Sequence, residues 1–217
     1  MDIVSGNFGL NSQFKTNATE PLKLYFGDFD DNTSTDPILV SYVQGKPFPF
    51  PSRDELLDQV YGFRSKFTDY ASYAEATIEQ ILTKEQLANS SKLEANELRS
   101  MYFENNAGKF IPHVLPIEAQ FAPIHAIHVF DYNNDGNLDL VLAGNQSYTR
   151  LRLGMMDANL GQLYRGDGKG NFQFIPQRES GFSILGDVKS ILQLPSRPNL
   201  LYFGINNKGL INYQKND

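Results

Sequence analysis

The sequence predicts a mainly β fold in which a repeat of antiparallel strands is interrupted by a helical insertion. The 16 Phe, 11 Tyr, 17 Gly and 11 Pro among 217 residues favour strands and tight turns over a helical bundle. A ten-residue pattern at Met101–Phe110 recurs at Leu163–Phe172, sixty-two positions later. From Ser52 onward, by contrast, the apolar residues follow a helical spacing.

Each copy of the ten-residue pattern reads as a strand, a polar turn containing glycine, and a second strand, which predicts a hairpin. Two further pairs of segments match downstream: Ala126–Phe130 with Val188–Leu192, and Leu140–Gly144 with Leu200–Gly204. Val4–Asn7 likewise matches Leu142–Asn145. We therefore expect the chain to open within the closing strands of a preceding repeat.

The helical insertion is expected over residues 52–91. Ser52 and Glu55 have the spacing of a capping box. An apolar stripe follows at helical spacing: Leu56, Val60, Phe63 and Phe67. Two later segments carry the same start signal, Ser72–Glu75 and Thr83–Gln86. The chain is expected to return to strand from residue 92.

The run Asp131–Asp139 predicts a calcium loop. Oxygen-bearing side chains occupy positions 1, 3, 5 and 9 of this loop: Asp131, Asn133, Asp135 and Asp139. Gly136 stands at position 6, where a loop that wraps an ion turns with positive φ, and Asn137 would offer its backbone carbonyl. The loop is no EF-hand, because position 12 holds Leu142 in place of a bidentate Glu. The alternative is an Asx-rich turn without metal.

A second run, Asp28–Asp36, has the same layout. Its side-chain oxygens stand at the same four positions, in Asp28, Asp30, Asn32 and Asp36. Ser34 would supply the carbonyl, and Thr33 replaces the glycine, which makes the turn costlier. The corresponding stretch of the last repeat, residues 193–199, contains no carboxylate, so we expect that repeat to lack a metal.

Composition excludes several classes of function. A net charge of −6 and a pI near 5.1 argue against nucleic acid as a partner. The absence of cysteine excludes thiol catalysis, Cys-type zinc sites and disulfides, and is compatible with an envelope or extracellular protein. No stretch has the length of a membrane span and no signal peptide precedes Asp2, so an exported protein would carry its targeting signal outside this sequence.

Together, the acidic loops and the Leu163–Phe172 hairpin resemble FG-GAP/VCBS repeats, the family that builds the integrin-α-type β-propeller and its bacterial relatives, including proteins similar to cartilage acidic protein. With Phe26–Asp30, the resemblance spans most of the chain. Three further segments resemble the C-terminal part of large bacterial envelope proteins of this type: Asn7–Asn11, Ser52–Leu56 and Glu118–Ala122. The resemblance implies antiparallel four-stranded β-propeller blades, with calcium in the loop between two strands of a blade. Thr33 and the missing carboxylates at 193–199 depart from the family pattern.

A closed propeller needs 4–8 blades, so we expect a partial propeller. The predicted organisation has four parts: residues 1–51 with the end of one blade, the start of the next and the first acidic loop; residues 52–91 with the helical insertion; residues 92–160 with the main calcium loop; and residues 161–217 with a repeat that lacks the metal loop. The expected partners are the rest of its own polypeptide, or another protein or glycan at the cell surface, with self-association through blade edges.

The predicted function is a calcium-binding, non-enzymatic recognition or scaffold module of a bacterial envelope or secreted protein. The alternative is part of a glycan-processing or other hydrolase built on a propeller. The sequence shows no nucleophile elbow, zincin motif or phosphate loop. His125 and His128 would face opposite sides of a strand, and His113 shows no evident partner. Arg165–Asp167 spells the tripeptide that integrins recognise, but its Gly and Asp also suit a hairpin tip.

Overall fold

The computed structural model describes residues 1–214 and is mainly β, with four antiparallel sheets. The chain divides into two compact units. We call Phe14–Glu97 the inserted unit, and we call Met1–Gln13 together with the described residues from Leu98 onward the strand unit. No helix among residues 1–214 is long and apolar enough to cross a membrane.

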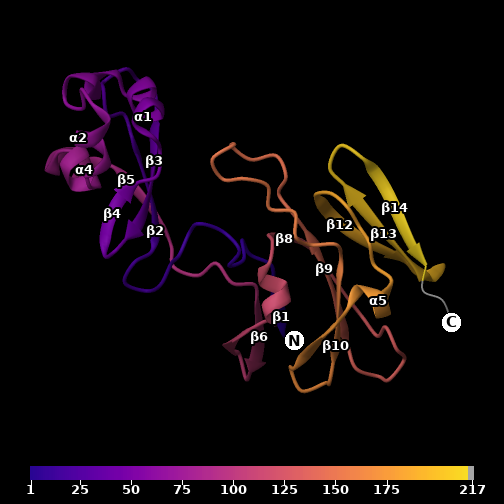
Figure 1. Cartoon of the computed structure of the whole chain (residues 1–217). Coiled ribbons are helices and arrows are strands. Elements are labelled where there is room, and N and C mark those ends of the chain that lie inside the picture. The colour runs from indigo at the N-terminus through magenta and orange to yellow at the C-terminus, as the bar shows by residue number, and fades with distance from the viewer. Residues whose placement is uncertain (215–217) are drawn as a thin grey trace. The chain divides into compact units, whose positions relative to one another are not determined.

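The inserted unit combines one four-stranded sheet with a group of short helices (Figure 1). The strands, in the order in which they are hydrogen-bonded, are β4 (Lys46–Pro49), β3 (Asp36–Val43), β2 (Leu22–Gly27) and β5 (Ser91–Ala95). The helices are α1 (Arg53–Gln59), η1 (Tyr61–Ser65), α2 (Tyr70–Ala74), α3 (Ile78–Ile81) and α4 (Lys84–Asn89). The helices predicted from the apolar spacing after Ser52 are therefore present.

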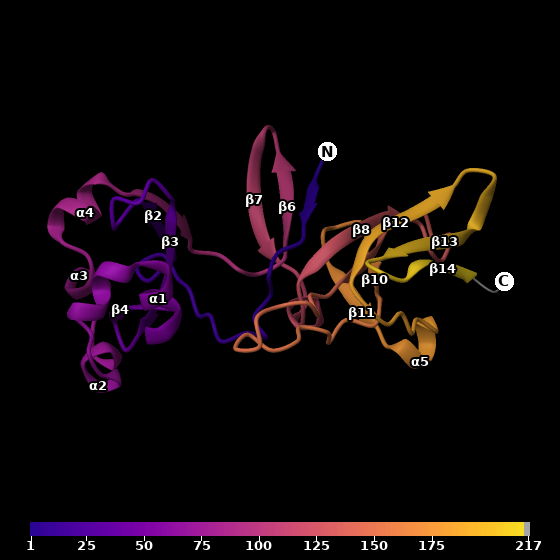
Figure 2. The same ribbon diagram turned by 90° about the horizontal axis from the view of Figure 1, so that it is seen from above.

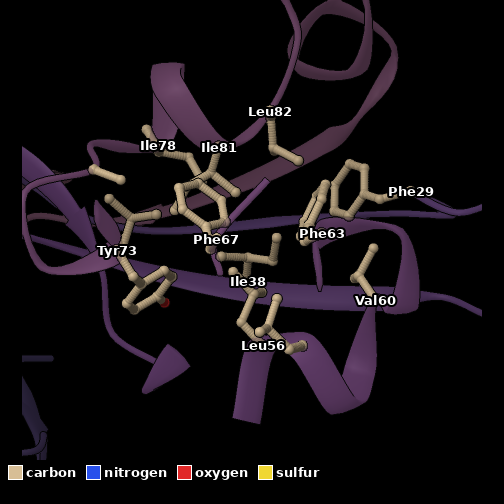
Figure 3. Close-up of a cluster of buried hydrophobic side chains, with 13 residues drawn as sticks. Phe29, Ile38, Leu56, Val60, Phe63, Phe67, Tyr73, Ile78, Ile81 and Leu82 are labelled. Atoms are coloured by element: carbon tan, nitrogen blue, oxygen red, sulfur yellow. The ribbon is translucent and has the colours of Figure 1, made fainter. Parts of the chain in front are cut away.

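The apolar stripe of the helical segment packs against the sheet. Leu56, Val60, Phe63 and Phe67 are all buried, and they share one core cluster with Ile38 and Val40 of β3. Figure 3 shows Ile38 between side chains from several helices. Because every helix is short, we attribute their stability to this shared burial rather than to helix propensity.

Two of the three predicted capping boxes are confirmed, at Ser52–Glu55 and Thr83–Gln86. The one predicted at Ser72–Glu75 is wrong. Asp69 caps α2 instead, because its carboxylate accepts a hydrogen bond from the N–H of Ser72 at 2.8 Å. Thr77 and Gln80 then form the capping box of α3.

The extent of the insertion differs from the predicted residues 52–91. The first acidic loop and strands β2–β5 belong to the same compact unit as the helices, because β5 pairs with β2 and closes the sheet that the helices cover. The ends of this unit lie together, since Thr16 Oγ1 donates to the Asn96 carbonyl at 3.2 Å. On the other side of the junction, the Gly9 N–H donates to the Leu98 carbonyl at 2.7 Å. The insertion is thus the whole of Phe14–Glu97.

The strand unit contains three antiparallel sheets (Figure 2). The first sheet consists of β1 (Ile3–Ser5), β6 (Met101–Asn106) and β7 (Lys109–Val114). The middle sheet has the order β11 (Phe172–Ile175), β10 (Gln162–Gly166), β9 (Asp139–Gly144) and β8 (Ile124–Phe130). The third sheet consists of β12 (Val188–Leu194), β13 (Arg197–Ile205) and β14 (Gly209–Gln214). Two short helices, η2 (Ile117–Gln120) and α5 (Gln177–Ser180), lie in the connections.

The middle sheet is covered on both faces. Leu140 and Leu142 of β9 share a cluster with Tyr102 of the first sheet. Val141 and Ala143, which point to the opposite face, share another cluster with Phe203 of the third sheet. Strand β9 is accordingly buried along its whole length. The three sheets therefore pack face to face in a row, and the β6–β7 and β10–β11 hairpins predicted from the repeat are both present.

Candidate metal centre

The second acidic loop, Asp131–Asp139, connects β8 to β9 and curls around its own side chains. The two carboxylate oxygens of Asp131 accept hydrogen bonds from the N–H groups of Asp135, at 3.1 Å, and Gly136, at 2.9 Å. Asp135 in turn accepts from the N–H of Asn137 at 2.8 Å. Asp139 closes the loop by accepting from the N–H of Tyr132 at 2.7 Å.

The first acidic loop, Asp28–Asp36, connects β2 to β3 and repeats these bonds position by position. Asp28 accepts from the N–H groups of Asn32, at 3.0 Å, and Thr33, at 2.8 Å. Asn32 accepts from the N–H of Ser34 at 2.7 Å. Asp36 accepts from the N–H of Phe29 at 3.0 Å. Two loops in different compact units therefore have the same fold.

The backbone of the two loops agrees as well. Position 4 is left-handed in both, with φ +59° at Asn134 and +60° at Asp31. Position 6 is also left-handed, with φ +86° at Gly136 and +69° at Thr33. A β-branched residue rarely adopts this conformation. Thr33 adopts this conformation because the rest of the loop imposes the turn. The loop therefore has the same conformation with threonine at position 6 as with glycine.

The carboxylates converge in the first loop. Asp28, Asp30 and Asp36 each offer an oxygen within 4.8 Å of the others, and no other group of three metal-ligating residues of this kind occurs among residues 1–214. One oxygen of Asp30, Oδ1, is buried without a hydrogen-bond partner in the described structure. Burial, together with the charges of Asp30 and Asp28, raises the pKa of Asp36, although the bond from Phe29 opposes this shift. A buried, unsatisfied oxygen among like charges is the environment that a cation would relieve.

The second loop has the Asn at position 3 and the Asp at position 5, the reverse of the first loop. The side chain of Asn133 donates to Asp135 at 2.7 Å. The pKa of Asp135 is lowered by the bond from the Asn137 N–H, then by Asn133, with a smaller contribution from the charge of Arg165. Asp139 is buried and also accepts from the Gly166 N–H of β10 at 2.8 Å. The loop's own donors thus satisfy more of its oxygens than in the first loop.

No acidic loop lies between β12 and β13, where the strands are joined by a tight turn. Residues 193–199 fall within these two strands and their turn, and none of them is acidic. The strands of this repeat therefore form without the acidic loop.

All three histidines have neighbours, which corrects the expectation for His113. Its Nε2 lies 3.2 Å from Oε2 of Glu104, in a pair that is about half exposed on the first sheet. His128 Nε2 lies 3.1 Å from the Gln193 side-chain oxygen, and burial, together with the charge of Lys189, lowers the pKa of His125. No histidine is among the described residues that line the clefts beside the two loops.

The tripeptide Arg165–Asp167 lies at the start of the β10–β11 turn. The Asp167 carboxylate accepts from the Lys169 N–H at 2.8 Å and from the Asn171 side chain at 2.7 Å, and these bonds lower its pKa. Gly166 is buried in the sheet. The Asp167 carboxylate is thus used by its own turn.

A buried carboxylate that the sequence did not single out lies where the middle and third sheets meet. Asp187 accepts from both the N–H and the hydroxyl of Ser147, the latter at 2.6 Å. Burial raises the pKa of Asp187, but these bonds outweigh it, so the net shift is downward. Asn145, which lies with Ser147 in the connection between β9 and β10, donates to the carbonyls of Asn159 and Gly186. We read this network as the anchor of the long loop between β9 and β10.

Three clefts have described walls near these loops. One of about 620 Å³ lies between the first sheet and the tips of the middle sheet, and its walls include Tyr102, Asn137 and Phe172. Another, of about 530 Å³, lies beside the first acidic loop, with Asp30 and Lys66 on its walls. The third, of about 170 Å³, lies beside the second acidic loop, with Asn133 and Arg165 on its walls.

Comparison with known proteins adds no relative: no family model, no curated protein and no solved structure matches this chain.

Proposed function

We propose that the protein is a calcium-binding, non-enzymatic recognition or scaffold module whose strand unit consists of blades of a partial β-propeller of the FG-GAP/VCBS type. The observation that carries the calcium proposal is the matched pair of acidic loops. Two segments of different sequence adopt one hydrogen-bond pattern, and in the first loop three carboxylates converge around an oxygen that lacks a partner.

The residues of both loops fit a hard cation that prefers oxygen ligands. In the first loop, Asp28, Asp30, Asn32 and Asp36 would supply side-chain oxygens and Ser34 its carbonyl. In the second loop, the corresponding set is Asp131, Asn133, Asp135, Asn137 through its carbonyl, and Asp139. Calcium would neutralise the mutual repulsion of the carboxylates, and the last Asp of each loop would link the ion to the strand that follows.

The first site would also tie the helices to the sheet. Phe29, within the loop, belongs to the core cluster of the inserted unit. Its carbonyl accepts a hydrogen bond from the Gln86 side chain of α4 at 3.0 Å. Loss of the ion would therefore loosen the contact between α4 and the loop as well as the loop itself.

Two features of the strand unit support the propeller proposal. The middle sheet is antiparallel and four-stranded, and the sheets on either side pack on its two faces. The second acidic loop joins two neighbouring strands of that sheet, as the family resemblance implies. For a place in the bacterial envelope or outside the cell, we expect the affinity range of extracellular calcium modules, about 10⁻⁴–10⁻³ M.

The non-enzymatic proposal rests on where the titratable side chains lie. Catalysis needs titratable groups that converge in a pocket, and here the converging carboxylates lie in the proposed metal loop. The Glu104–His113 pair is exposed on the surface of a sheet. The rival proposal, a glycan-processing hydrolase, would gain support if Glu104→Gln abolished a hydrolytic activity of the purified protein.

Calorimetric titration of the chelated protein with Ca²⁺ tests the calcium proposal. We expect two sites in the wild type and one in each of Asp30→Asn and Asp135→Asn. Asp157→Asn, an exposed acidic residue outside both loops, is the matched control and should leave both sites. At a free concentration about ten times Kd, calcium should stabilise the protein by about 1.4 kcal/mol per site. A titration without heat, together with a melting temperature unchanged by chelator, would overturn the proposal.

A further inference from the structure

The largest of the three clefts lies wholly within the strand unit, between the first sheet and the turn ends of the middle sheet. Its volume of about 620 Å³ lies in the range of small-molecule sites. Of the proposed metal ligands, only Asn137, which would use its backbone carbonyl, is among the described residues that line it. The cleft is therefore a separate feature from the second acidic loop.

The β10–β11 turn forms one wall of the cleft and is held there by close packing. A Cβ on Gly170 would lie 2.9 Å from the ring of Tyr102 in the first sheet, and a Cβ on Gly168 would overlap the side-chain oxygen of Asn137. Both glycines also have positive φ. Glycine at these two positions lets the turn lie against the first sheet and the acidic loop together, so the wall is formed before any ligand arrives.

Two carboxylates on the walls are ionised at neutral pH. Asp2 accepts hydrogen bonds from the Tyr102 hydroxyl and the Asn105 N–H, and these bonds lower its pKa. Asp167 accepts from the Asn171 side chain, which lowers its pKa in the same way. Both groups therefore face the cleft as anions.

The charge and the hydrogen bonds of the walls favour a positively charged donor. No Lys, Arg or His side chain is among the described residues that line the cleft. The amino group of Met1 lies near Asp2 and offsets one of the two negative charges, so the described walls keep a net negative charge. Ionised carboxylates only accept hydrogen bonds, and the side-chain donors of Tyr102 and Asn171 are already bonded to them.

Apolar side chains complete the described walls. Val129 is 44% exposed and Leu138 is 61% exposed, and both line the cleft together with Phe172. Such side chains gain by packing against the methylene groups of a ligand. Carboxylates beside apolar surface match an ammonium group carried on an alkyl chain.

We propose that this cleft binds an alkylammonium ion, the group found at the end of a lysine side chain and in small diamines. The ammonium donates to the wall carboxylates, and the alkyl chain packs against Val129 and Leu138. This site goes beyond the proposed function and requires no metal in either acidic loop.

Amide NMR spectra of the full chain test this proposal with three probes at matched ionic strength. Acetyl-lysine amide and cadaverine carry the ammonium, while acetyl-norleucine amide carries an alkyl chain without it. Calcium is present, so that the acidic loops do not compete for the probes. We expect both ammonium probes to shift the signals of Gly168 and Gly170 in a saturable way, and acetyl-norleucine amide to leave them in place.

The pattern of responses identifies the source of the ligand. Binding of acetyl-lysine amide alone would identify a lysine of a protein partner, and binding of cadaverine alone would identify a small diamine. An equal response to all three probes, or a response to none, would overturn the proposal.

Charge-removing variants then locate the ammonium. Asp167→Asn keeps a side-chain oxygen for its turn but loses the charge, and it should weaken ammonium binding by about fivefold. Asp2→Asn should act similarly, and it replaces Asp167→Asn if that variant fails to fold. Asp157→Asn, at an exposed acidic residue outside the cleft, is the matched control and should bind as the wild type does. A loss in either cleft variant supports the site, and an unchanged affinity in both would overturn it.

Discussion

Position 6 of the two acidic loops offers a residue-level test of how backbone conformation is imposed. Thr33 has φ +69°, where a left-handed conformation costs an L-residue about 1–2 kcal/mol. Glycine avoids this cost but loses about 0.5–1 kcal/mol of backbone entropy. We therefore expect Thr33→Gly to stabilise the inserted unit by about 0.5–1 kcal/mol in urea denaturation.

The reverse change in the second loop serves as the matched control. Gly136 has φ +86°, and a Cβ there would meet no atom within 4 Å. The cost of Gly136→Ala is then conformational alone, and we expect the strand unit to lose about 1 kcal/mol. If Thr33→Gly destabilised the protein, the similarity of the two loop conformations would be in doubt.

The buried hydroxyl of Tyr102 makes the stability of the folded state depend on pH. Its hydroxyl donates to Asp2 Oδ2 at 2.5 Å, and this bond, with burial, raises the pKa of Tyr102 to about 12. The unfolded chain releases this proton near pH 10, so the unfolded state binds fewer protons between pH 10 and 12. The stabilisation is complete below pH 10 and is lost as the pH rises to about 12.

Ultraviolet titration of tyrosinate, read as the difference between the wild type and Tyr102→Phe, measures that pKa. In Asp2→Asn the acceptor charge is gone, and the pKa of Tyr102 should move toward 10. Glu20→Gln, remote in sequence and partly buried in the inserted unit, should leave it unchanged. An unaltered titration in Asp2→Asn would contradict the assignment of the shift to this hydrogen bond.

At this scale the sequence predicted which residues lie in the two loops but not how their oxygens are arranged. Ligand spacing is visible in one dimension, so both loops were found. Each loop has three Asp and one Asn at the four ligand positions, and whether the carboxylates meet depends on which position carries the Asn. In the second loop Asn133 stands at position 3 and bonds to Asp135. The partner of His113 was missed because Glu104 lies on the neighbouring strand of a hairpin, in a diagonal pair that only the register defines.

At the scale of elements, the repeat predicted where the strands lie but not which face of the sheet each side chain occupies. The aligned tyrosines, Tyr102 and Tyr164, occupy the same core cluster, although they come from sheets on opposite sides of it. Tyr102 of the first sheet points toward the middle sheet, and Tyr164 of the middle sheet points back toward the first sheet. A shift of one residue in a strand reverses every side chain, and the irregular register at Ile124–Ala126 and at Val188–Ser190 also disturbs the match between repeats. Similarity of composition cannot reveal such a shift.

The two Ser-x-x-Glu segments of the inserted unit give an element-level prediction. Ser52 accepts from the Glu55 N–H, and Glu55 bonds back to the Ser52 N–H at 2.8 Å, so Ser52→Ala should cost about 1 kcal/mol. Ser72 lies inside the first turn of α2, whose cap is Asp69, so Ser72→Ala should cost only a few tenths of a kcal/mol. Thermal unfolding followed at 222 nm by circular dichroism compares them, and equal losses would contradict the assigned caps.

For the whole molecule, the sequence predicted the helices within residues 52–91 but not that they share a compact unit with the first acidic loop. The first acidic loop looks like part of the repeat, because its spacing and the apolar strand after it match the second loop. Only the pairing of β5 with β2, across the entire helical segment, shows that this loop belongs with the helices. Such long-range pairing leaves no local signal, since β5 is a short exposed edge strand whose partner lies far away in the sequence.

The division of the chain leads to a prediction about both units. The inserted unit has its own core cluster, and its two ends are held together by the bond between Thr16 and Asn96. Residues 14–97 should therefore fold as a separate protein and bind one calcium ion in the first acidic loop. The strand unit, with Gln13 joined to Leu98 by a short Gly/Ser linker, should keep its three sheets, because the bond between Gly9 and Leu98 already closes that junction. Two-dimensional amide NMR spectra of the two proteins should together reproduce most of the spectrum of the full chain. A collapsed spectrum for residues 14–97 with saturating calcium would show that this core needs the strand unit to fold.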